Sequence, residues 1–272
     1  MTRTQSWTAQ ATSPEETAVD ALARVSQLPK ARVKDAMNKG AVWLKRGKDE
    51  KRLRRSTATL RSGDTLTLHY NPDILSLTPP APALVADERA YSVWDKPAGL
   101  LAQGSREGDH CSLLRIAEQQ LNREVFLVHR LDREASGLML IAHTRKAAAA
   151  LSALFARPDA TPELRKIYRV EVKGEVPGSG VWQRALDGKA AETRFTREDF
   201  DAQMQRSVVR VELVTGRKHQ IRRHFADADF PVLGDPAYGR NNNDPRGLQL
   251  RAVELAFTCP LTHKPRDYRL PD

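Results

Sequence analysis

Two stretches near the start of the chain repeat apolar residues at the spacing of an amphipathic helix. In the first, Val19, Leu22 and Ala23 fall on one face, and Ser13, which precedes a Pro-Glu-Glu sequence, has the form of an N-cap. The second stretch covers residues 29–39 and is followed by a glycine, which often ends a helix. The pattern therefore predicts two consecutive short helices.

The next apolar residues alternate with polar ones, which is typical of half-buried strands. Residues 41–44 and 65–70 follow this pattern. Prolines then become frequent in a segment with few residues able to join a core, and this composition predicts an extended, semi-rigid linker. We therefore predict a small module over residues 14–72, a linker over 73–83 and a second domain over 84–272.

In the second domain, apolar runs that fit strands outnumber those that fit helices. Several of these strands follow one another without a helix between them, so a mixed, mainly antiparallel sheet fits better than a doubly wound parallel one. The predicted fold class is α+β. The expected strands are 90–94, 125–128, 137–142, 166–173, 207–214 and 249–257, and the expected helices are 112–121, 146–155 and 218–226.

Positive charge is concentrated in the first part of the chain. The 272 residues include 44 Lys and Arg against 34 Asp and Glu, a net charge of +10, and residues 1–80 hold 14 of the cations and 8 of the anions. The densest run, residues 45–55, would attract the phosphate backbone of a nucleic acid. A solvated surface loop is the alternative, and membrane binding is disfavoured because no amphipathic aromatic helix accompanies the run. The residues expected to contact such a backbone are Lys30, Lys34, Lys45, Arg46, Lys48, Lys51, Arg52, Arg54 and Arg55.

Composition narrows the class of protein further. The apolar runs fall short of the roughly 20 residues that span a bilayer, and the start of the chain lacks the apolar core of a signal peptide. Cys111 and Cys259 are too few and too far apart for a disulfide framework. We expect a globular, cytoplasmic protein with a basic surface.

One polar constellation follows the strand expected at 125–128. If the chain stays extended there, Arg130 and Asp132 point to the same side and His129 to the other. A carboxylate beside a guanidinium is held ionised, which suits a nucleophile or a base and not a general acid. A salt bridge at a strand end explains the same spacing, and the spacing by itself favours that structural interpretation.

A second constellation puts cations at the start of a predicted helix. Thr215 is the expected N-cap, and Arg217 and Lys218 follow in the first turn, where positive charge opposes the helix dipole. This conflict indicates that an anionic ligand, or a carboxylate from elsewhere in the fold, lies there; a surface basic helix is the alternative. A third feature, Tyr168, shares the apolar face of an expected strand and is by default a core tyrosine.

Two predicted helices at the front of the chain are followed by Lys39-Gly-Ala-Val42 at the entry to a strand and by Arg61-Ser-Gly-Asp64 before the last strand. This order, over about residues 18–70, resembles the αL (ribosomal-protein-S-four-like) RNA-binding module. The chain departs from the usual pattern after the first strand, where its basic turn is longer. The resemblance implies that the backbone-binding residues of this module contact RNA, and we expect a monomer that binds RNA and no membrane.

Five motifs follow one another across about residues 85–270. The central motif contains His129-Arg-Leu-Asp132 and Ser136-Gly137. The other four motifs are Asp95-Lys-Pro-Ala-Gly99, Lys166-Ile-Tyr168, Gly216-Arg-Lys-His-Gln-Ile-Arg222 and Phe230-Pro-Val-Leu-Gly-Asp-Pro-Ala-Tyr-Gly239. In this order the motifs resemble those of the RluA family of RNA pseudouridine synthases. The chain departs from the family pattern at Ala135 and Lys218, which stand where threonine is usual.

The resemblance implies an isomerase that detaches uracil from its ribose, rotates it and rejoins it through carbon 5, without a metal or an organic cofactor. By resemblance, Asp132 is the carboxylate that starts the reaction and Arg222 is its basic partner, with Arg217 as the fallback partner. Tyr168 resembles the catalytic tyrosine that stacks on the uracil, with removal of the carbon 5 proton as a second role for it. Arg130 resembles the residue that fills the gap left by the flipped nucleotide. The substrate-binding residues expected on this basis are Arg130, Arg217, His219 and Lys96.

The expected substrate is a structured RNA, with ribosomal RNA favoured over transfer RNA. The alternative function is a non-catalytic RNA chaperone or ribosome-assembly factor that uses the same basic surface. Retention of Asp132 together with its motif partners argues against this alternative, because a pure binder needs no nucleophile. A DNA-binding regulator is disfavoured further, because no recognition helix or dimerising heptad repeat is evident.

Overall fold

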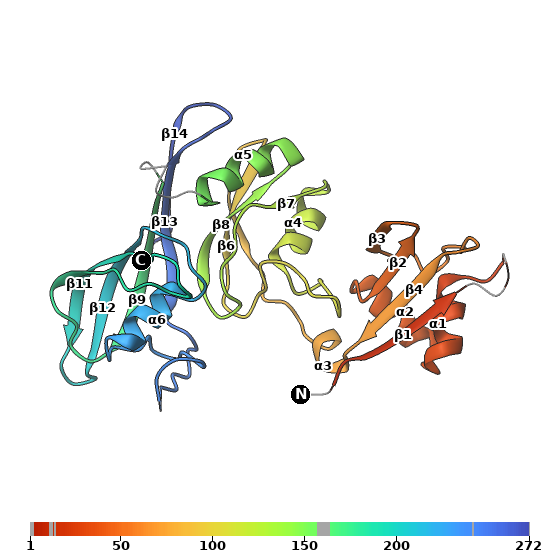
Figure 1. Ribbon diagram of the computed structural model, residues 1–272, viewed down its shortest axis with the longest axis horizontal. Coiled ribbons are helices and arrows are strands. Elements are labelled where there is room, and N and C mark those ends of the chain that lie inside the picture. The colour runs from red at the N-terminus through yellow and green to blue at the C-terminus, as the bar shows by residue number, and fades with distance from the viewer. Residues whose placement is uncertain (1–2, 11–12, 14, 157–163, 241, 272) are drawn as a thin grey trace. The chain divides into compact units, whose positions relative to one another are not determined.

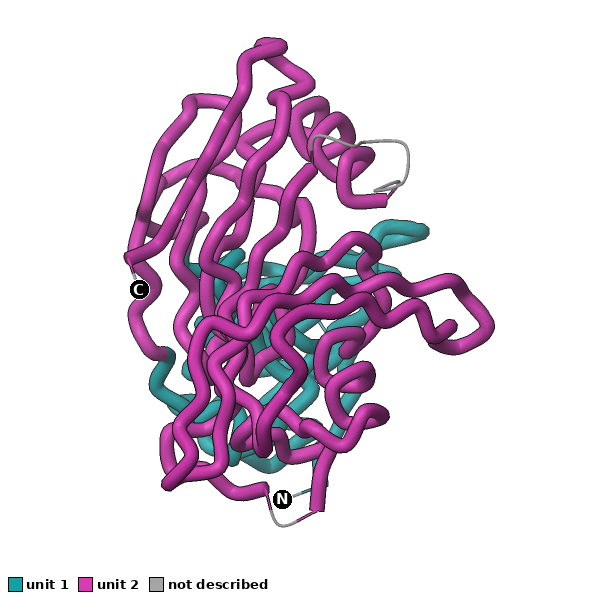
Figure 2. Tube along the Cα trace, turned by 90° about the vertical axis from the view of Figure 1, so that its left-hand side faces the viewer, with its two compact units in different colours: residues 1–79, 103–116 teal, residues 80–102, 117–272 magenta. Residues whose placement is uncertain are grey.

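The computed structural model describes residues 3–10, 13, 15–156, 164–240 and 242–271 (Figure 1). The chain divides into two compact units, which are coloured separately in Figure 2. None of the helices in the described part combines the length and apolar character needed to cross a membrane. The first unit contains residues 1–79 and 103–116, and the second contains residues 80–102 and 117–272.

The first unit is a four-stranded antiparallel sheet with two helices packed on one face. The strand order is β1-β4-β2-β3. Alternate residues of the central strands, such as Leu66, Leu68 and Val42, are buried together with Leu22 and Met37 of the helices, because successive side chains of a strand point to opposite faces. The elements are β1 (Gln5–Gln10), α1 (Ala18–Ser26), α2 (Lys30–Asn38), β2 (Val42–Arg46), β3 (Asp49–Arg52), β4 (Thr65–Tyr70) and α3 (Pro72–Leu75).

Three local features of this unit differ from the sequence prediction. Thr17, not Ser13, caps α1, because its hydroxyl accepts the backbone N–H of Asp20. The pattern did not predict β1, which pairs with β4 along its whole length. The beginning of the expected linker is the short helix α3, whose first N–H groups donate to the side chain of Asn71.

Residues 103–116 belong to the first unit, although the chain has already entered the second unit at residues 80–102. Asp109 forms ion pairs with Arg52 at 3.1 Å and with Arg54 at 2.5 Å. Both arginines belong to the basic run that the sequence assigns to RNA binding. Their contacts with Asp109 extend the first unit beyond the predicted range of 14–72.

The second unit is a mixed, mainly antiparallel sheet of strand order β10-β11-β12-β9-β13-β8-β6-β5, in which β14 pairs with β13 and β7 with β8. Among the pairings of the described residues, only β13 with β8 is parallel. The predicted α+β class is confirmed. The strands are β5 (Ala83–Asp87), β6 (Tyr91–Lys96), β7 (Phe126–Leu127), β8 (Ser136–Ala142), β9 (Arg165–Lys173), β10 (Ser179–Trp182), β11 (Thr193–Asp201), β12 (Arg206–Leu213), β13 (Leu250–Thr258) and β14 (Pro265–Arg269), and the helices are α5 (Arg145–Ala156) and α6 (Gln220–Asp227). The residues of a further helix, α4 (Leu113–Leu121), are divided between the two units.

The parallel contact between β8 and β13 joins the two halves of this sheet. Gly137 of β8 lies opposite Ala252 of β13 and has φ +111°. A Cβ at this glycine would collide with the backbone carbonyl and amide of Ala252, which cannot move without breaking the ladder. Leu151 of α5 packs in a core that includes Leu140 of β8 and Phe257 of β13. The junction fixes the first residues of β8, directly after the loop between β7 and β8.

Replacing Gly137 by alanine is expected to lower the free energy of unfolding by about 3 kcal/mol or more, because backbone strain and a steric clash act together. Gly188→Ala is the matched control. Gly188 also has positive φ (+72°) but has no atom within 4 Å of the added Cβ, so only about 1–2 kcal/mol is expected. Urea unfolding of the three proteins measures both values; equal losses would contradict the close approach of β8 to β13.

Candidate active site

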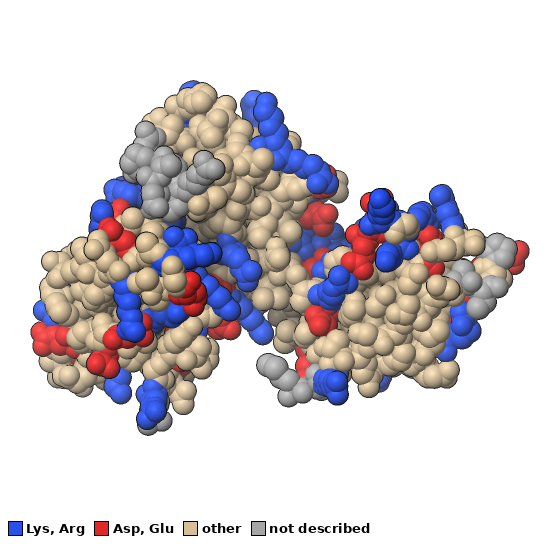
Figure 3. Space-filling model, in the orientation of Figure 1, with Lys and Arg blue, Asp and Glu red and all other residues tan. Residues whose placement is uncertain are grey.

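A cavity of about 480 Å³ lies in the second unit where three elements meet. The loop between β7 and β8 contributes Arg130 and Asp132, β9 contributes Tyr168, and the first turn of α6 contributes Arg222. Figure 3 shows Lys and Arg side chains gathered over the face of this unit that carries α6. The cavity therefore combines the carboxylate of Asp132 with several cations. The other lining residues are Leu131, Ala135, Leu213, Gly216, Arg217, Lys218, His219, Gln220, Ile221 and Leu250.

Arg222 lies between two carboxylates. Its Nη1 donates to Asp132 Oδ2 at 3.0 Å, while Nε and Nη2 donate to the two oxygens of Asp235 at 2.7 and 2.6 Å. Arg222 and Asp235 are buried, whereas 26% of the Asp132 side chain is exposed. Burial opposes the charge of Arg222, but the hydrogen bonds to Asp235 and Asp132 outweigh it and raise the pKa of the guanidinium above its usual value. The permanent positive charge of Arg222 therefore faces Asp132, and of the two carboxylates only Asp132 lines the cavity.

Asp235 is held by the backbone of its own loop. Its Oδ1 also accepts the N–H groups of Ala237 and Tyr238, at 2.8 and 3.1 Å. Gly234, just before it, has φ +70°, and a Cβ there would collide with the carbonyl of Gly247. The loop thus presents a fixed carboxylate to Arg222 in the bidentate geometry that suits a guanidinium. Asp235 lies within the last of the five motifs, but the sequence prediction did not single it out; the Gly-Asp pair was the available signal.

Helix α6 begins later than the sequence predicts. It starts at Gln220, and His219 precedes it in the left-handed region with φ 54°. Thr215 does not cap it: the threonine hydroxyl donates to Gln220 Oε1 at 2.7 Å, and the same oxygen accepts the backbone N–H of Arg217 at 3.0 Å. Arg217 and Lys218, the cations expected in the first turn, therefore lie before the helix. Arg222 is a cation of the first turn instead, and its partners Asp132 and Asp235 are carboxylates from elsewhere in the fold.

His219 approaches the second oxygen of Asp132. Its Nε2 lies 3.6 Å from Asp132 Oδ1, and its Nδ1 lies 3.1 Å from the hydroxyl of Tyr238. Burial lowers the pKa of His219 by more than the nearby charge of Asp132 raises it, which favours the neutral imidazole at neutral pH. Arg222 is therefore the cation that pairs with Asp132.

Tyr168 faces the cavity from the middle of the sheet. It lies opposite Val211 of β12 and Ala252 of β13, and it is only partly buried. The default expectation of a core tyrosine is therefore replaced by a ring at the wall of the cavity. Burial and, to a smaller extent, the charge of Asp132 raise the pKa of Tyr168, so its hydroxyl stays protonated at neutral pH.

Two further residues that the sequence assigns to substrate binding also line the cavity. Arg130 is exposed there. Arg217 lines the cavity from the segment before α6, and its Nε donates to the carbonyl of Ala190 at 2.9 Å. The structure thus pairs Asp132 with Arg222, and not with Arg217, the fallback partner.

The expectation that Lys96 contacts the substrate needs correction. Lys96 is fully buried, and its ammonium donates to four carbonyl oxygens, the two shortest distances being 2.6 Å to Ala135 and 2.8 Å to Leu100. Burial lowers its pKa to about 8. These contacts tie the turn that follows Asp132 to the loop after β6, so Lys96 supports the site from behind its wall.

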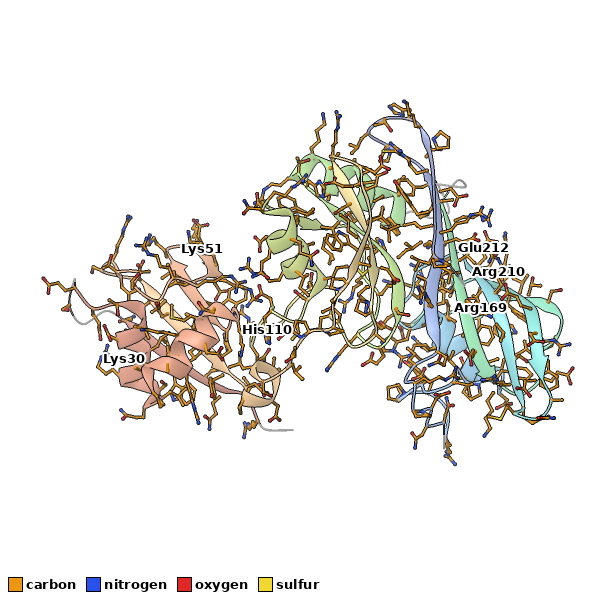
Figure 4. All side chains as sticks on the ribbon, turned by 180° about the vertical axis from the view of Figure 1, so that it is seen from behind. Lys30, Lys51, His110, Arg169, Arg210 and Glu212 are labelled. Atoms are coloured by element: carbon orange, nitrogen blue, oxygen red, sulfur yellow. The ribbon has the colours of Figure 1, made fainter. Side chains whose placement is uncertain are left out.

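The nine residues that the sequence assigns to RNA binding fall into two groups. Arg46 is paired with the buried Asp64 at 2.6 Å, Lys30 with Asp20 at 2.6 Å, and Arg52 and Arg54 with Asp109. Figure 4 shows Lys30 and Lys51 on separate parts of the surface of the first unit. The members without an ion pair among the described residues are Lys34, Lys45, Lys48, Lys51 and Arg55.

Comparison with known proteins assigns the chain to a family. The RNA pseudouridylate synthase family matches residues 90–227. The dual-specificity RNA pseudouridine synthase RluA of Vibrio parahaemolyticus is 31% identical over 75% of this chain and 87% of its own length. The tRNA pseudouridine synthase C of the same species is 29% identical over 66% of this chain and 86% of its own length.

Solved structures agree on the fold. Human RNA pseudouridylate synthase domain containing 1 matches with a TM-score of 0.61 and 19% identity, over 72% of this chain and 86% of its own. Human RNA pseudouridylate synthase domain containing 4 matches with a TM-score of 0.57 and 22% identity, over 70% of this chain and 88% of its own. The fold, the family match and the RluA relative confirm the resemblance found in the motifs: the chain belongs to the RNA pseudouridylate synthase family.

Proposed function

We propose that this enzyme isomerises uridine to pseudouridine in structured ribosomal or transfer RNA, with Asp132 as the carboxylate that starts the reaction. The observation that carries the proposal is the contact of Asp132 with Arg222 at the wall of a cavity that Tyr168 also lines. Attack on the ribose, attack on the base and removal of a ribose proton all start from the carboxylate of Asp132, and the hydrogen bond from Arg222 holds this carboxylate at the cavity wall.

A uridine must leave its stack before it can reach this cavity. Enzymes that act on a base flip the nucleotide out and read it by stacking and by hydrogen bonds in a pocket. Tyr168 supplies an aromatic ring at the wall, and Arg130 is an exposed cation at the same cavity that can occupy the vacated position in the RNA. The raised pKa of Tyr168 favours the stacking role over removal of the carbon 5 proton, since a protonated phenol is a poor base.

The class of RNA is supported by the relatives and by the charge of the first unit. One relative is named as a transfer RNA enzyme and another as a dual-specificity RNA enzyme. Pseudouridine mapping in total RNA from cells with and without this protein tests the proposal. We expect specific uridines in ribosomal or transfer RNA to lose the modification when the protein is absent; an unchanged map in both RNAs would contradict it.

The unpaired lysines of the β2–β3 hairpin are expected to provide salt-dependent affinity for RNA. Replacing Lys45, Lys48 and Lys51 by glutamine should weaken binding and reduce the slope of log K against log salt by about 0.7 to 0.9 for each phosphate that is no longer neutralised. The rate at saturating RNA should stay close to that of the unchanged protein. Filter binding across a salt series measures the slope.

Arg46→Gln is the matched control in the same hairpin. Arg46 already pairs with Asp64, whose side chain is 1% exposed, so its loss should lower the stability of the first unit rather than change the salt slope. If the salt slope falls equally in the lysine variant and in Arg46→Gln, the prediction is wrong, because paired and unpaired cations would then contribute alike to RNA binding.

A further inference from the structure

A second cavity, of about 340 Å³, adjoins the active-site cavity and has no part in the chemistry proposed above. The two cavities share Arg130, Tyr168, Leu213 and Gly216 as lining residues, so they meet along the line of Arg130 and Tyr168. We call it the neighbour cavity. Its other lining residues are Val128, His129, Leu138, Ser152, Phe155, Ala156, Lys166, Ala252, Glu254 and Leu255.

Two rings form one wall of the neighbour cavity. The His129 and Phe155 rings are stacked, with centroids 4.1 Å apart and planes 10° from parallel. Nε2 of His129 accepts the backbone N–H of Leu140 at 3.0 Å, so the ring proton lies on Nδ1. Burial lowers the pKa of His129 to about 3, with a smaller effect from the charge of Lys166, and the ring is therefore neutral at neutral pH.

This wall also carries an available hydrogen-bond donor. The Nδ1–H of His129 has no acceptor among the residues that the structure describes. Carbonyl oxygens and ring nitrogens of nucleobases are acceptors that could take this bond. An aromatic wall with one polar group is typical of a pocket that binds a flat ligand.

We infer that the neighbour cavity takes an unpaired nucleobase of the same RNA strand, adjacent to the uridine in the active-site cavity. This inference rests on the proposed function. The continuity of the two cavities and the stacked rings of His129 and Phe155 at the wall fit two adjacent bases of one strand. The preferred substrate is then a uridine in a loop or bulge with at least one unpaired neighbour, and not a uridine inside a continuous duplex.

Two alanines at the end of α5 provide a matched test. Ala156 lines the neighbour cavity and is exposed, so Ala156→Trp narrows the cavity from its edge without disturbing the core. Ala153 is exposed on the same helix and does not line the cavity, so Ala153→Trp is the control. Thermal unfolding should be unchanged in both variants.

The probe is a stem-loop transcript that contains the uridine located by mapping, and two further transcripts lack the base on its 5′ or its 3′ side. With the complete transcript, Ala156→Trp should raise KM about tenfold, the usual contribution of one stacked base, and leave the single-turnover rate at saturating RNA unchanged. Ala153→Trp should match the unchanged protein. On one of the two abasic transcripts, all three proteins should have the same raised KM.

The outcomes separate this inference from the proposed function. If the protein forms pseudouridine and Ala156→Trp has the KM of the control, the neighbour cavity takes no base and the inference is wrong while the function stands. If Ala156→Trp raises KM equally on the complete and on both abasic transcripts, the cavity contacts something other than a neighbouring base, and the inference is again wrong. If the unchanged protein forms no pseudouridine in ribosomal or transfer RNA, both fail.

Discussion

Asp132→Asn should reduce pseudouridine formation by at least about 10³-fold while leaving the protein folded and able to bind RNA. The amide has nearly the same shape as the carboxylate but carries no charge, so it cannot act as nucleophile or base. Arg222 keeps its two hydrogen bonds to Asp235, and the cavity wall therefore stays in place. Nucleoside analysis of the RNA product measures the loss, and filter binding measures the retained affinity.

Glu134→Gln is the matched control for this variant. Glu134 is a carboxylate two residues further along the same loop, and it does not line the active-site cavity. Its replacement should leave product formation within a few-fold of the unchanged protein. Equal loss in both variants would mean that the charge of the loop, and not the Asp132 carboxylate, supports the reaction.

Arg222→Gln should have the largest effect on stability of any single change at the site. The substitution leaves the carboxylate of Asp235 without its cation, although the Asp235 side chain is completely buried. Breaking a buried ion pair from one side costs about 3–5 kcal/mol. Activity should also disappear, because Asp132 loses the guanidinium that fixes it. Urea unfolding and product analysis measure the two effects.

A second substitution separates these effects. Combining Arg222→Gln with Asp235→Asn removes the uncompensated charge, so much of the lost stability should return while activity stays at background. Arg223→Gln serves as the control, since Arg223 pairs with Asp187, whose side chain is 70% exposed, and should change stability by less than about 1 kcal/mol. A double variant no more stable than Arg222→Gln would contradict the role given to Asp235.

Much of the fold could be predicted from the alternation of apolar and polar residues. The pattern identified the buried strands β8, β9 and β13 because their inward faces are apolar along the whole strand. It did not identify β11, which carries charged residues through much of its length, or β1, which lies at a sheet edge. Strands with little burial show only weak alternation of apolar and polar residues. Whether such a strand forms depends on neighbouring strands that are distant in sequence.

Site residues that lie in a recognisable motif could be predicted from the sequence. Residues whose role depends on contacts between distant segments could not. Asp132, Arg222 and Tyr168 were named from motifs, and they line one cavity. The role of Asp235 as the partner of Arg222 depends on the contact of α6 with the loop that contains Asp235. The spacing of residues along the sequence does not reveal this contact. Lys96 has a charged side chain that the fold buries among carbonyls, and only the structure separates it from a lysine that meets the substrate.

Charge density also overstates the number of unpaired cations in the basic run of the first unit. Arg52 and Arg54 lie in the most basic run of the chain, but their guanidiniums meet Asp109 of residues 103–116. The carboxylate comes from a segment far along the chain, so the count of cations within the run cannot reveal it. Lys48 and Lys51 keep the solvent-facing role that the sequence predicts for the run.

Release of tritium from RNA that contains 5-tritiated uridine tests the central proposal most directly, because the new bond at carbon 5 must replace the one to hydrogen. The protein and its Asp132→Asn variant are compared in single turnover with unmodified ribosomal and transfer RNA. We predict release by the unchanged protein and only background release by the variant. Release at the same rate by both, or by neither, would contradict catalysis by Asp132.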